Sequence, residues 1–343
     1  MKITKRLTAL ALALLFAISA AGCGSSQNDA SNASSSSVSS AAVKSAKTSM
    51  NVVALKGPTG LSMAKLMGNS EDKKTEGNYN ISLVSSPDEI VSKVTGGKAD
   101  AVAVPTNLAA SLYNKTSGKV QIAAVTTLGV LYVLTNGENI SSIKDLKGKT
   151  VYLTGQGATP EYAFDYILEQ NGLTVGKDVK TVYEAEHAGL AAKMIAGSVK
   201  IAVLPEPFAT QVLMKNKNVK RALSVTDEWN KTAGGKSILS MGCLIVNKKF
   251  AQDNKDTFDK FLDEYKASAE YANANVDETA KLSAKYDIMP EAVAKKAIPN
   301  CGIVYIDGDE MKDKIPEFLK ILYTANPKSI GGKLPDDNFY YQK

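Results

Sequence analysis

Short apolar runs alternate with amphipathic stretches from about residue 50 onward. Runs of apolar and β-branched residues predict strands at 51–55, 79–84, 99–104 and 120–125. Helices are expected between these strands, one through Met67, one from Pro87 and one through Tyr113. Strands that alternate with helices imply βαβ units, so we expect an α/β fold with a mostly parallel sheet.

The same order of elements returns about one hundred residues later. Strands are predicted at 150–153, 179–183 and 201–204, with helices at 160–170 and 190–196. Four identical residues recur at an offset of 100, since Lys93, Gly97, Pro105 and Ala109 match Lys193, Gly197, Pro205 and Ala209. We interpret the two units as two similar, Rossmann-like lobes.

The rest of the chain differs from both units. A polar, turn-rich segment is expected at 226–236, with Trp229 as a packing residue beside a hinge, and one more strand at 240–246. The pattern is then helical, with an apolar face from Phe258 to Ala269. Further helices are expected from a cap at Asp277 through Tyr286, at 291–297 and at 309–323.

A helical extension without strands of its own needs another apolar surface to cover, so we expect it to pack on lobe I. Lobe I is then 50–126 together with 241–343, and lobe II is 127–240. The chain would cross between the lobes twice, near Thr127 and near Ser240, and two crossings form a hinge with a cleft beside it.

The first 22 residues read as a secretory signal peptide. Lys2, Lys5 and Arg6 precede sixteen uncharged residues, which is shorter than the roughly 20 that a membrane-spanning helix needs. The run ends in Ala-Ala-Gly before Cys23, which resembles the bacterial lipoprotein cleavage box and implies cleavage there and acylation of Cys23. The Ser-rich residues 23–49 are expected to be a disordered tether.

Composition excludes several classes of function. The chain has 343 residues, a single histidine and three cysteines, which is too few for most zinc sites, so no metal is expected. Removal of the signal peptide reduces 41 basic residues to 38, against 35 acidic residues, so no basic surface for nucleic acid is implied. Cys243 and Cys301 are expected to be buried thiols, although export would permit a disulfide.

The predicted strands end in turns suited to ligand binding. In open parallel sheets, ligands bind beyond the carboxyl ends of the strands, where helix starts offer unpaired N–H groups. Four such turns can be identified from the sequence: residues 57–60, 105–107, 155–159 and 205–207. Gly and Pro are also usual in ordinary βα turns, so the paired set in two lobes carries more weight than any single turn.

The whole chain resembles a solute-binding lipoprotein of an ABC importer. The resemblance rests on the lipoprotein box, the tether, residues 55–60, 97–101 and 204–208, and the helical extension. It implies the type 2 periplasmic-binding-protein fold, within the group that binds nitrate, sulfonates, taurine and thiamine-precursor pyrimidines. A monomer, anchored on the outer face of the cell membrane by lipid at Cys23, would deliver a small molecule to permease and ATPase subunits without a cofactor.

The resemblance also implies a set of ligand-contacting residues. These are Thr59, Gly60, Thr106, Asn107, Gly157, Ala158, Thr159 and Glu206, with Leu128 and Gly129 at the first crossing.

The ligand is inferred from the charged residues near this set. Arg221 is the only arginine after the signal peptide and follows a helix on the far side of a strand, so an arginine clamp on an anion is not expected. Glu206 in the cleft mouth would accept N–H groups, or it would only interact with its own helix dipole. We therefore expect a nitrogen heterocycle such as a pyrimidine, or a small sulfonate such as taurine.

Aromatic side chains could contribute to such a site. Tyr132, Tyr162 and Phe208 could stack on a flat ligand or could belong to the core. His187, near the start of a helix in lobe II, is expected to be solvent-exposed or to cap that helix.

Two alternatives to a transport function are open at this level. One is an enzyme on the same fold, in thiamine-pyrimidine or menaquinone synthesis, although His187 is the only imidazole available for catalysis. The other is a sensor lipoprotein that does not transport.

Overall fold

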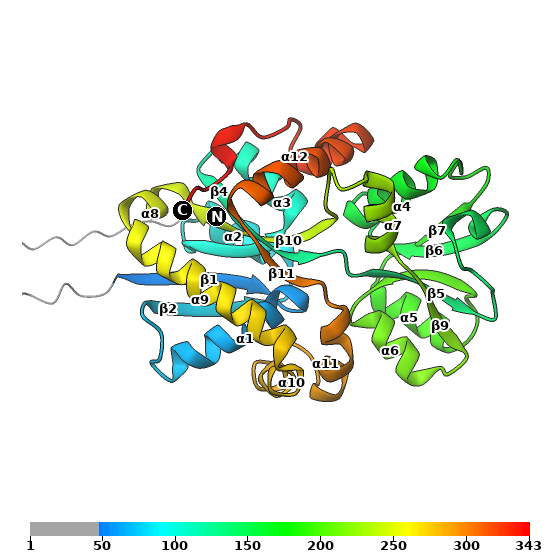
Figure 1. Cartoon of the computed structure of the whole chain (residues 1–343), viewed down its shortest axis with the longest axis horizontal. Helices are drawn as coiled ribbons and strands as arrows, with labels where there is room; N and C mark the ends of the chain where they lie inside the picture. The colour runs from blue at the N-terminus through cyan, green and yellow to red at the C-terminus, as the bar shows by residue number, and fades with distance from the viewer. Residues whose placement is uncertain (1–47) are drawn as a thin grey trace, which may run out of the picture. The chain divides into compact units, whose positions relative to one another are not determined.

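The computed structural model describes residues 48–343 (Figure 1). The predicted signal peptide, the lipidation site Cys23 and nearly all of the predicted tether lie outside the described residues. Within 48–343, eleven strands form two sheets and twelve α-helices surround them, which confirms the expected α/β class with two lobes. No helix in this range combines the length and apolar character needed to cross a bilayer.

The first sheet, which forms lobe I, has six strands in the order β11-β4-β10-β3-β1-β2. Its strands are β1 (Ser49–Leu55), β2 (Asn78–Val84), β3 (Ala101–Pro105), β4 (Val120–Leu128), β10 (Ser240–Asn247) and β11 (Ile303–Ile306). β1 is parallel to β2 and β3, whereas β10 is antiparallel to β3 and β4.

The second sheet, which forms lobe II, has five strands in the order β7-β6-β8-β5-β9. Its strands are β5 (Leu131–Asn136), β6 (Thr150–Thr154), β7 (Lys180–Glu184), β8 (Ile201–Pro205) and β9 (Val219–Ser224). β6 is parallel to β7 and β8, whereas β5 is antiparallel to β8 and β9.

The internal repeat predicted from the sequence is confirmed. β3 and β8 lie one hundred residues apart in the sequence. The same offset separates α2 (Pro87–Thr95) from α5 (His187–Ile195). The order β2-β1-β3-β10-β4 in lobe I matches β7-β6-β8-β5-β9 in lobe II. The two lobes are therefore built to one plan, with β10 and β5 in the same place.

Most strands of each sheet run in one direction, as predicted, but β10 and β11 of lobe I and β5 of lobe II run in the opposite direction. The sequence pattern did not identify β5 as a strand. A strand's own residues also do not encode its direction, which depends on the side from which the chain returns.

The antiparallel strands direct the carboxyl ends of both sheets toward each other. Leu131, the first residue of β5, pairs with Pro205 at the end of β8. Gly242, near the start of β10, pairs with Pro105 at the end of β3. Because the chain crosses between lobes just before β5 and just before β10, these two edges face each other across the crossings.

The remaining helices cover the sheets or connect them (Figure 1). They are α1 (Pro58–Glu71), α3 (Thr106–Lys115), α4 (Thr159–Gln170), α6 (Phe208–Lys215), α7 (Val225–Ala233), α8 (Lys248–Asp253), α9 (Lys255–Ala274), α10 (Val276–Lys285), α11 (Glu291–Ala297) and α12 (Gly308–Ala325).

α7 replaces the polar turn that the sequence predicts at 226–236. Ser224 caps this helix, since its side chain accepts a hydrogen bond from the Asp227 N–H at 3.2 Å. Val225, Trp229 and Ala233 are buried, and their spacing of four residues forms one apolar face. The polar residues between them hid this helical period.

A smaller correction concerns α10, which the sequence predicts to be capped by Asp277. The helix begins at Val276, and Asn275 is its N-cap. Asp277 instead lies in the first turn, where a carboxylate interacts favourably with the helix dipole.

The C-terminal extension contacts both lobes rather than lobe I alone. α12 packs on lobe I and also against α4 of lobe II. Phe318 of α12 lies 5.9 Å, between ring centroids, from Trp229 of α7, and Trp229 lies 5.0 Å from Tyr166 of α4. Asn326 Nδ2 also donates to the Tyr162 hydroxyl at 2.8 Å. One apolar core therefore continues from lobe I into lobe II.

Cys243 and Cys301 are both buried and both free. Burial raises the pKa of the Cys243 thiol to about 12, which keeps it protonated at neutral pH. The expectation of buried thiols is confirmed.

Replacement of Trp229 should destabilise the protein strongly, because this side chain has no exposed surface and joins α7 to α4 and α12. We expect Trp229→Ala to lower the free energy of unfolding by about 3–5 kcal/mol, as for other buried aromatic truncations. Urea unfolding measures this, and Leu334→Ala at the 42%-exposed Leu334 should change it by less than about 0.5 kcal/mol. A loss below about 1 kcal/mol for Trp229→Ala would contradict this packing.

Candidate functional site

The lobe I half of the candidate site begins at the start of α1. Thr59 Oγ1 donates to the Leu55 carbonyl at 2.9 Å. Gly60 is buried, and a Cβ there would lie 3.0 Å from the Leu55 carbonyl oxygen. A Cβ on Gly242 would lie 2.8 Å from Thr59 Cγ2 and 3.1 Å from Thr127 Oγ1. The absence of a side chain at Gly242 thus allows α1 and β4 to approach β10.

The start of α3 provides the next residues of this half. Thr106 and Ser240 share a hydrogen bond of 2.7 Å between their hydroxyl groups, and both are buried. Asn107 Nδ2 donates to the Ser329 carbonyl at 3.3 Å, so its amide is held by the C-terminal extension. Of the two predicted contacts, Thr106 thus lies beside the second crossing, and Asn107 is directed toward the extension.

Leu128 and Gly129 lie at the first crossing, where the chain is fixed on both sides. The Leu128 N–H donates to the Gly302 carbonyl at 2.8 Å, and Thr226 Oγ1 donates to the Gly129 carbonyl at 2.8 Å. A Cβ on Gly129 would lie 2.2 Å from Thr226 Oγ1. Only glycine therefore fits at residue 129 without displacement of Thr226.

The lobe II half contains the loop before α4. The Gly157 N–H donates to Glu161 Oε2 at 2.5 Å, and Gly157 has a φ of 75°, which favours glycine. Gly157 is exposed, Ala158 is half-buried and Thr159 is buried. This carboxylate bond stays within the loop and the first turn of α4.

Glu206 is placed differently from its prediction as an open acceptor in the cleft mouth. Its side chain has no exposed surface, and its carboxylate pairs with the Arg221 guanidinium. The other carboxylate oxygen accepts the Thr210 N–H at 3.0 Å. Burial raises the pKa of Glu206, and Thr210 and Arg221 oppose that effect. Both oxygens therefore already have protein donors in this structure.

Arg221 connects this ion pair to the lobe junction, the region where β5 of lobe II meets the C-terminal extension. Its guanidinium carbon lies 4.1 Å from the centroid of the Tyr132 ring, and the Tyr132 hydroxyl donates to the Asn300 carbonyl at 2.9 Å. Tyr132 belongs to β5, whereas Asn300 lies in the C-terminal extension. Of the aromatic residues considered from the sequence, Tyr132 is thus a structural link rather than an open stacking surface.

The structure also brings residues to the site that the sequence analysis did not select. Thr127 is 2% exposed, and its hydroxyl has no hydrogen-bond partner among residues 48–343. Burial of a hydroxyl without a hydrogen-bond partner costs free energy unless water or a ligand supplies that partner. The signal in the sequence is the polar pair Thr126-Thr127 directly after the apolar run 122–125.

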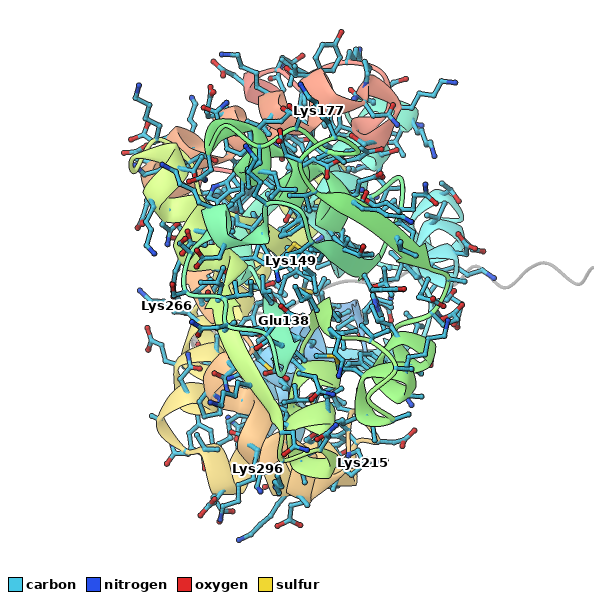
Figure 2. The ribbon with its side chains drawn as sticks, turned by 90° about the vertical axis from the view of Figure 1, so that its right-hand side faces the viewer. Glu138, Lys149, Lys177, Lys215, Lys266 and Lys296 are labelled. Carbon is cyan, nitrogen blue, oxygen red and sulfur yellow. The ribbon has the colours of Figure 1, made fainter. Side chains whose placement is uncertain are left out.

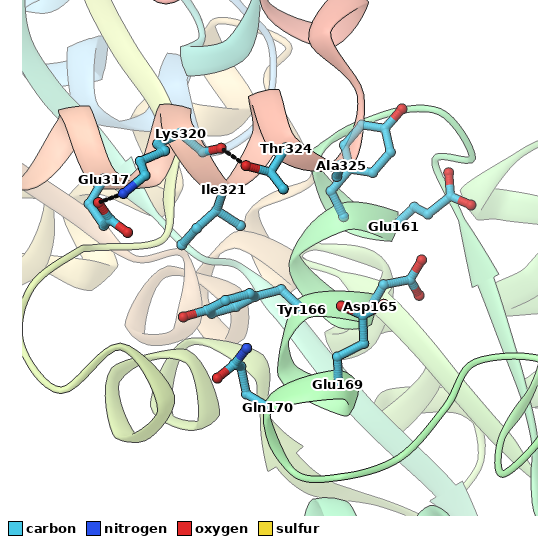
Figure 3. Close-up of a pocket in the computed structure, with 11 residues that line it drawn as sticks. Glu161, Asp165, Tyr166, Glu169, Gln170, Glu317, Lys320, Ile321, Thr324 and Ala325 are labelled. Carbon is cyan, nitrogen blue, oxygen red and sulfur yellow. Dashed lines mark hydrogen bonds and ion pairs between the residues drawn. The ribbon is translucent and has the colours of Figure 1, made fainter.

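A cavity of about 510 Å³ lies elsewhere, between α4 and α12. Figure 3 shows Glu161, Asp165 and Glu169 of α4 beside it, opposite Glu317, Lys320 and Ile321 of α12. Burial, with the nearby Glu161 and Glu169, raises the pKa of Asp165 from 3.8 to about 6. None of the ligand contacts that the resemblance implies lines this cavity, but Tyr162, which the sequence offers as a possible stacking residue, does.

A smaller cavity of about 220 Å³ lies where α6 of lobe II meets α11 of the extension. Lys217, Arg221 and Lys296 line it, and Figure 2 shows Lys215 and Lys296 at the same end of the molecule. Residues 48–343 contain no group of three or more His, Cys, Asp or Glu side chains placed to hold a metal ion.

Comparison with known proteins adds to this geometry. Residues 85–279 match the model of the family described as NMT1/THI5 like. No curated protein matches the chain in sequence. An ABC transporter from Parabacteroides distasonis is similar in structure, with 25% identity and a TM-score of 0.72 over 86% of this chain and 99% of that chain.

Two further similar structures have lower identity. The periplasmic aliphatic sulphonate binding protein SsuA from Escherichia coli has 14% identity and a TM-score of 0.67, over 86% of this chain and 92% of that chain. The periplasmic nitrate-binding protein NrtA from Synechocystis has 15% identity and a TM-score of 0.53, over 77% and 74%. These likenesses confirm the expected type 2 periplasmic-binding-protein fold.

Removal of the Arg221 guanidinium should leave the Glu206 carboxylate buried without its counterion. We expect Arg221→Met to lower the free energy of unfolding by about 3–5 kcal/mol. The double variant Glu206→Gln with Arg221→Met should recover most of that loss, as measured by urea unfolding. Lys193→Met, which breaks the exposed pair with Glu184, should cost less than about 1 kcal/mol. Equal losses at the two pairs would be inconsistent with a buried ion pair.

Asp165 should make stability depend on pH. Its pKa is about 6 in the folded protein against 3.8 for a free side chain, so the folded state binds the extra proton between these values and stability falls as pH rises through them. Asp165→Asn should therefore stabilise the protein at pH 8, by about 1 kcal/mol after allowance for solvent screening, and not at pH 3.5. Thermal unfolding at both pH values measures this, with exposed Glu270→Gln as control. A gain of the same size at both values would exclude this cause.

Proposed function

This chain belongs to the NMT1/THI5-like family, and we propose that it is the extracytoplasmic solute-binding component of an ABC importer. It captures a small metabolite between its two lobes and delivers it to permease and ATPase subunits in the membrane. The family match spans more than half of the chain, and the similar structures include an ABC transporter and two periplasmic binding proteins.

The observation that carries this proposal is the set of helix starts at the facing carboxyl edges. α1, α3 and α4 begin there without a side-chain cap at Gly57, Pro105 or Ala158. Uncapped first-turn N–H groups need acceptors, and the dipole of each helix adds partial positive charge at its start. A ligand with polar acceptor atoms between the lobes would satisfy these groups.

We assign the ligand contacts to residues of both lobes. They are Thr59, Gly60, Thr106, Asn107, Leu128 and Gly129 of lobe I and the first crossing, and Gly157, Ala158 and Thr159 of lobe II. Glu206 supports this site from beneath, because its ion pair with Arg221 holds the turn that leads into α6. Closure would be favoured because contacts from both lobes exist only in the closed state.

The ligand class is a nitrogen heterocycle such as a pyrimidine, or a small sulfonate such as taurine. The Glu206 carboxylate does not favour one of these ligand classes over the other, because Arg221 neutralises its charge and it therefore does not repel a sulfonate. The ammonium of Lys56, near the start of α1, is likewise paired with Asp287. Both classes offer the acceptor atoms that the helix starts require.

The location follows from the N-terminal sequence. We propose that the signal peptide is removed before Cys23, that lipid on Cys23 anchors the protein to the outer face of the cell membrane, and that the tether holds a monomeric body near the permease. Two or more acyl chains provide stable membrane attachment.

A thermal-shift screen of the purified protein tests the ligand class. The panel contains pyrimidines, taurine and other sulfonates, nitrate and amino acids, and a ligand at one hundred times its Kd should stabilise the protein by about 2.7 kcal/mol. Thr127→Val should weaken binding of the compound found by about tenfold, as expected for a lost hydrogen bond, without loss of stability. Titration calorimetry measures the affinity.

The matched control is Thr324→Val on α12, whose hydroxyl bonds only the Lys320 carbonyl at 2.9 Å. Absence of any stabilising compound would count against the proposed ligand classes. Equal affinities of the two variants for a compound that binds would place the site away from β4.

A further inference from the structure

Three βα connections of lobe II meet at the only histidine of the chain. His187 is the first residue of α5, and its Nδ1 lies 2.5 Å from Oγ1 of Thr154, the last residue of β6. Its ring lies 5.3 Å, between centroids, from the ring of Phe208, the first residue of α6. We refer to His187, Thr154 and Phe208 as the imidazole cluster.

The register of the strands places this cluster at the edge that faces lobe I. Thr154 pairs with Glu184, and these are the last residues of β6 and β7. Phe208 follows β8, whose last residue, Pro205, pairs with Leu131 at the first crossing. The cluster therefore lies on the same edge of the sheet as the proposed contacts Gly157 and Thr159, although the resemblance assigned no role to it.

The hydrogen bond to Thr154 fixes the ring and leaves Nε2 as its outer nitrogen. Thr154 is 3% exposed, whereas His187 and Phe208 are both half-buried. His187 Nε2 has no hydrogen-bond partner in the part of the chain that the structure describes. The imidazole thus presents one polar atom next to an aromatic ring, to which it is tilted by 44°.

Burial favours the neutral form of this imidazole. Burial lowers the pKa of His187, and the neighbouring Glu186 carboxylate opposes that effect only in part. Glu184, at the end of β7, is paired with Lys193 at 2.5 Å, and the nearby Glu206 is paired with Arg221. A neutral imidazole can donate or accept at Nε2, according to its tautomer.

We propose that the imidazole cluster is the lobe II recognition surface for a flat nitrogen heteroaromatic ring, with Phe208 against the face of the ring and His187 Nε2 hydrogen-bonded to its polar edge. This inference rests on the proposed solute-binding function and selects between its two ligand classes. An aliphatic sulfonate has no flat face for Phe208, so the cluster discriminates against it.

Because His187 is the only histidine, any modified histidine must be this residue. The first measurement is carbethoxylation of the ligand-free protein by diethyl pyrocarbonate, mapped by mass spectrometry. We expect His187 to react when the protein is folded, and protection by a saturating hydroxymethyl-aminopyrimidine. A ring that reacts only after denaturation would overturn the inference, whatever the protein binds.

The second measurement compares the affinities of variants by calorimetry. His187→Asn keeps a polar group near Thr154 but removes the atom at Nε2, and we expect it to weaken pyrimidine binding about tenfold. His187→Gln places an amide near the Nε2 position and should retain more affinity. Phe208→Leu should weaken pyrimidine binding at least fivefold. Ala192→Ser, on the exposed side of α5, is the matched control and should leave the affinity unchanged.

The outcomes separate this inference from the proposed function. Tight binding of taurine, unaffected by His187→Asn or Phe208→Leu, would overturn the inference while the solute-binding function stands. Binding of the pyrimidine with equal affinity to wild type and both His187 variants would do the same. Binding of no compound on the panel would count against the proposed function and against this inference with it, whereas an unreactive His187 in a protein that binds a ligand would overturn the inference alone.

Discussion

β5 and β10 run antiparallel to the strands beside them, and this reversal determines how the two sheets face each other. Each reversed strand begins where the chain has just crossed between lobes, so its first residues lie beside the carboxyl ends of the parallel strands. The helix starts of both lobes are consequently brought to one region. If either strand ran parallel, its start would lie at the opposite edge of its sheet, and the crossings would join the lobes away from the ligand-binding ends.

The lobe junction is held by more than the two crossings. α12 carries Phe318 against Trp229, and the Tyr132 hydroxyl of β5 bonds the Asn300 carbonyl of the extension. The first contact involves α4, α7 and α12, and the second involves β5 and the turn before β11. The extension thus bridges the two lobes, and closure around a ligand would require these contacts to adjust.

The candidate site is nearly free of unpaired charge in lobe I. Lys56 is paired with Asp287, and hydroxyl groups of Thr59, Thr106, Thr127 and Ser240 line the ends of the strands. In lobe II the carboxylate of Glu206 is neutralised by Arg221. Recognition in such a site depends on directed hydrogen bonds and on shape rather than on ion pairing. A neutral imidazole beside an aromatic ring is consistent with that character.

The sequence by itself determined the elements and the repeat. β-branched runs located most strands, and the offset of one hundred residues located two lobes, because both signals arise from neighbours along the chain. It also identified the turns that carry Thr59, Thr106 and Gly157, since Gly and Pro mark such turns locally. Tertiary structure alone decided the direction of β5 and β10, the burial of Trp229 on a helix hidden among polar residues, and the pairing of Glu206 with Arg221. Each of these features depends on groups that are distant in sequence and come into contact only in the folded chain. A local sequence pattern therefore does not specify which group a buried charge pairs with, or which strands flank an inserted strand.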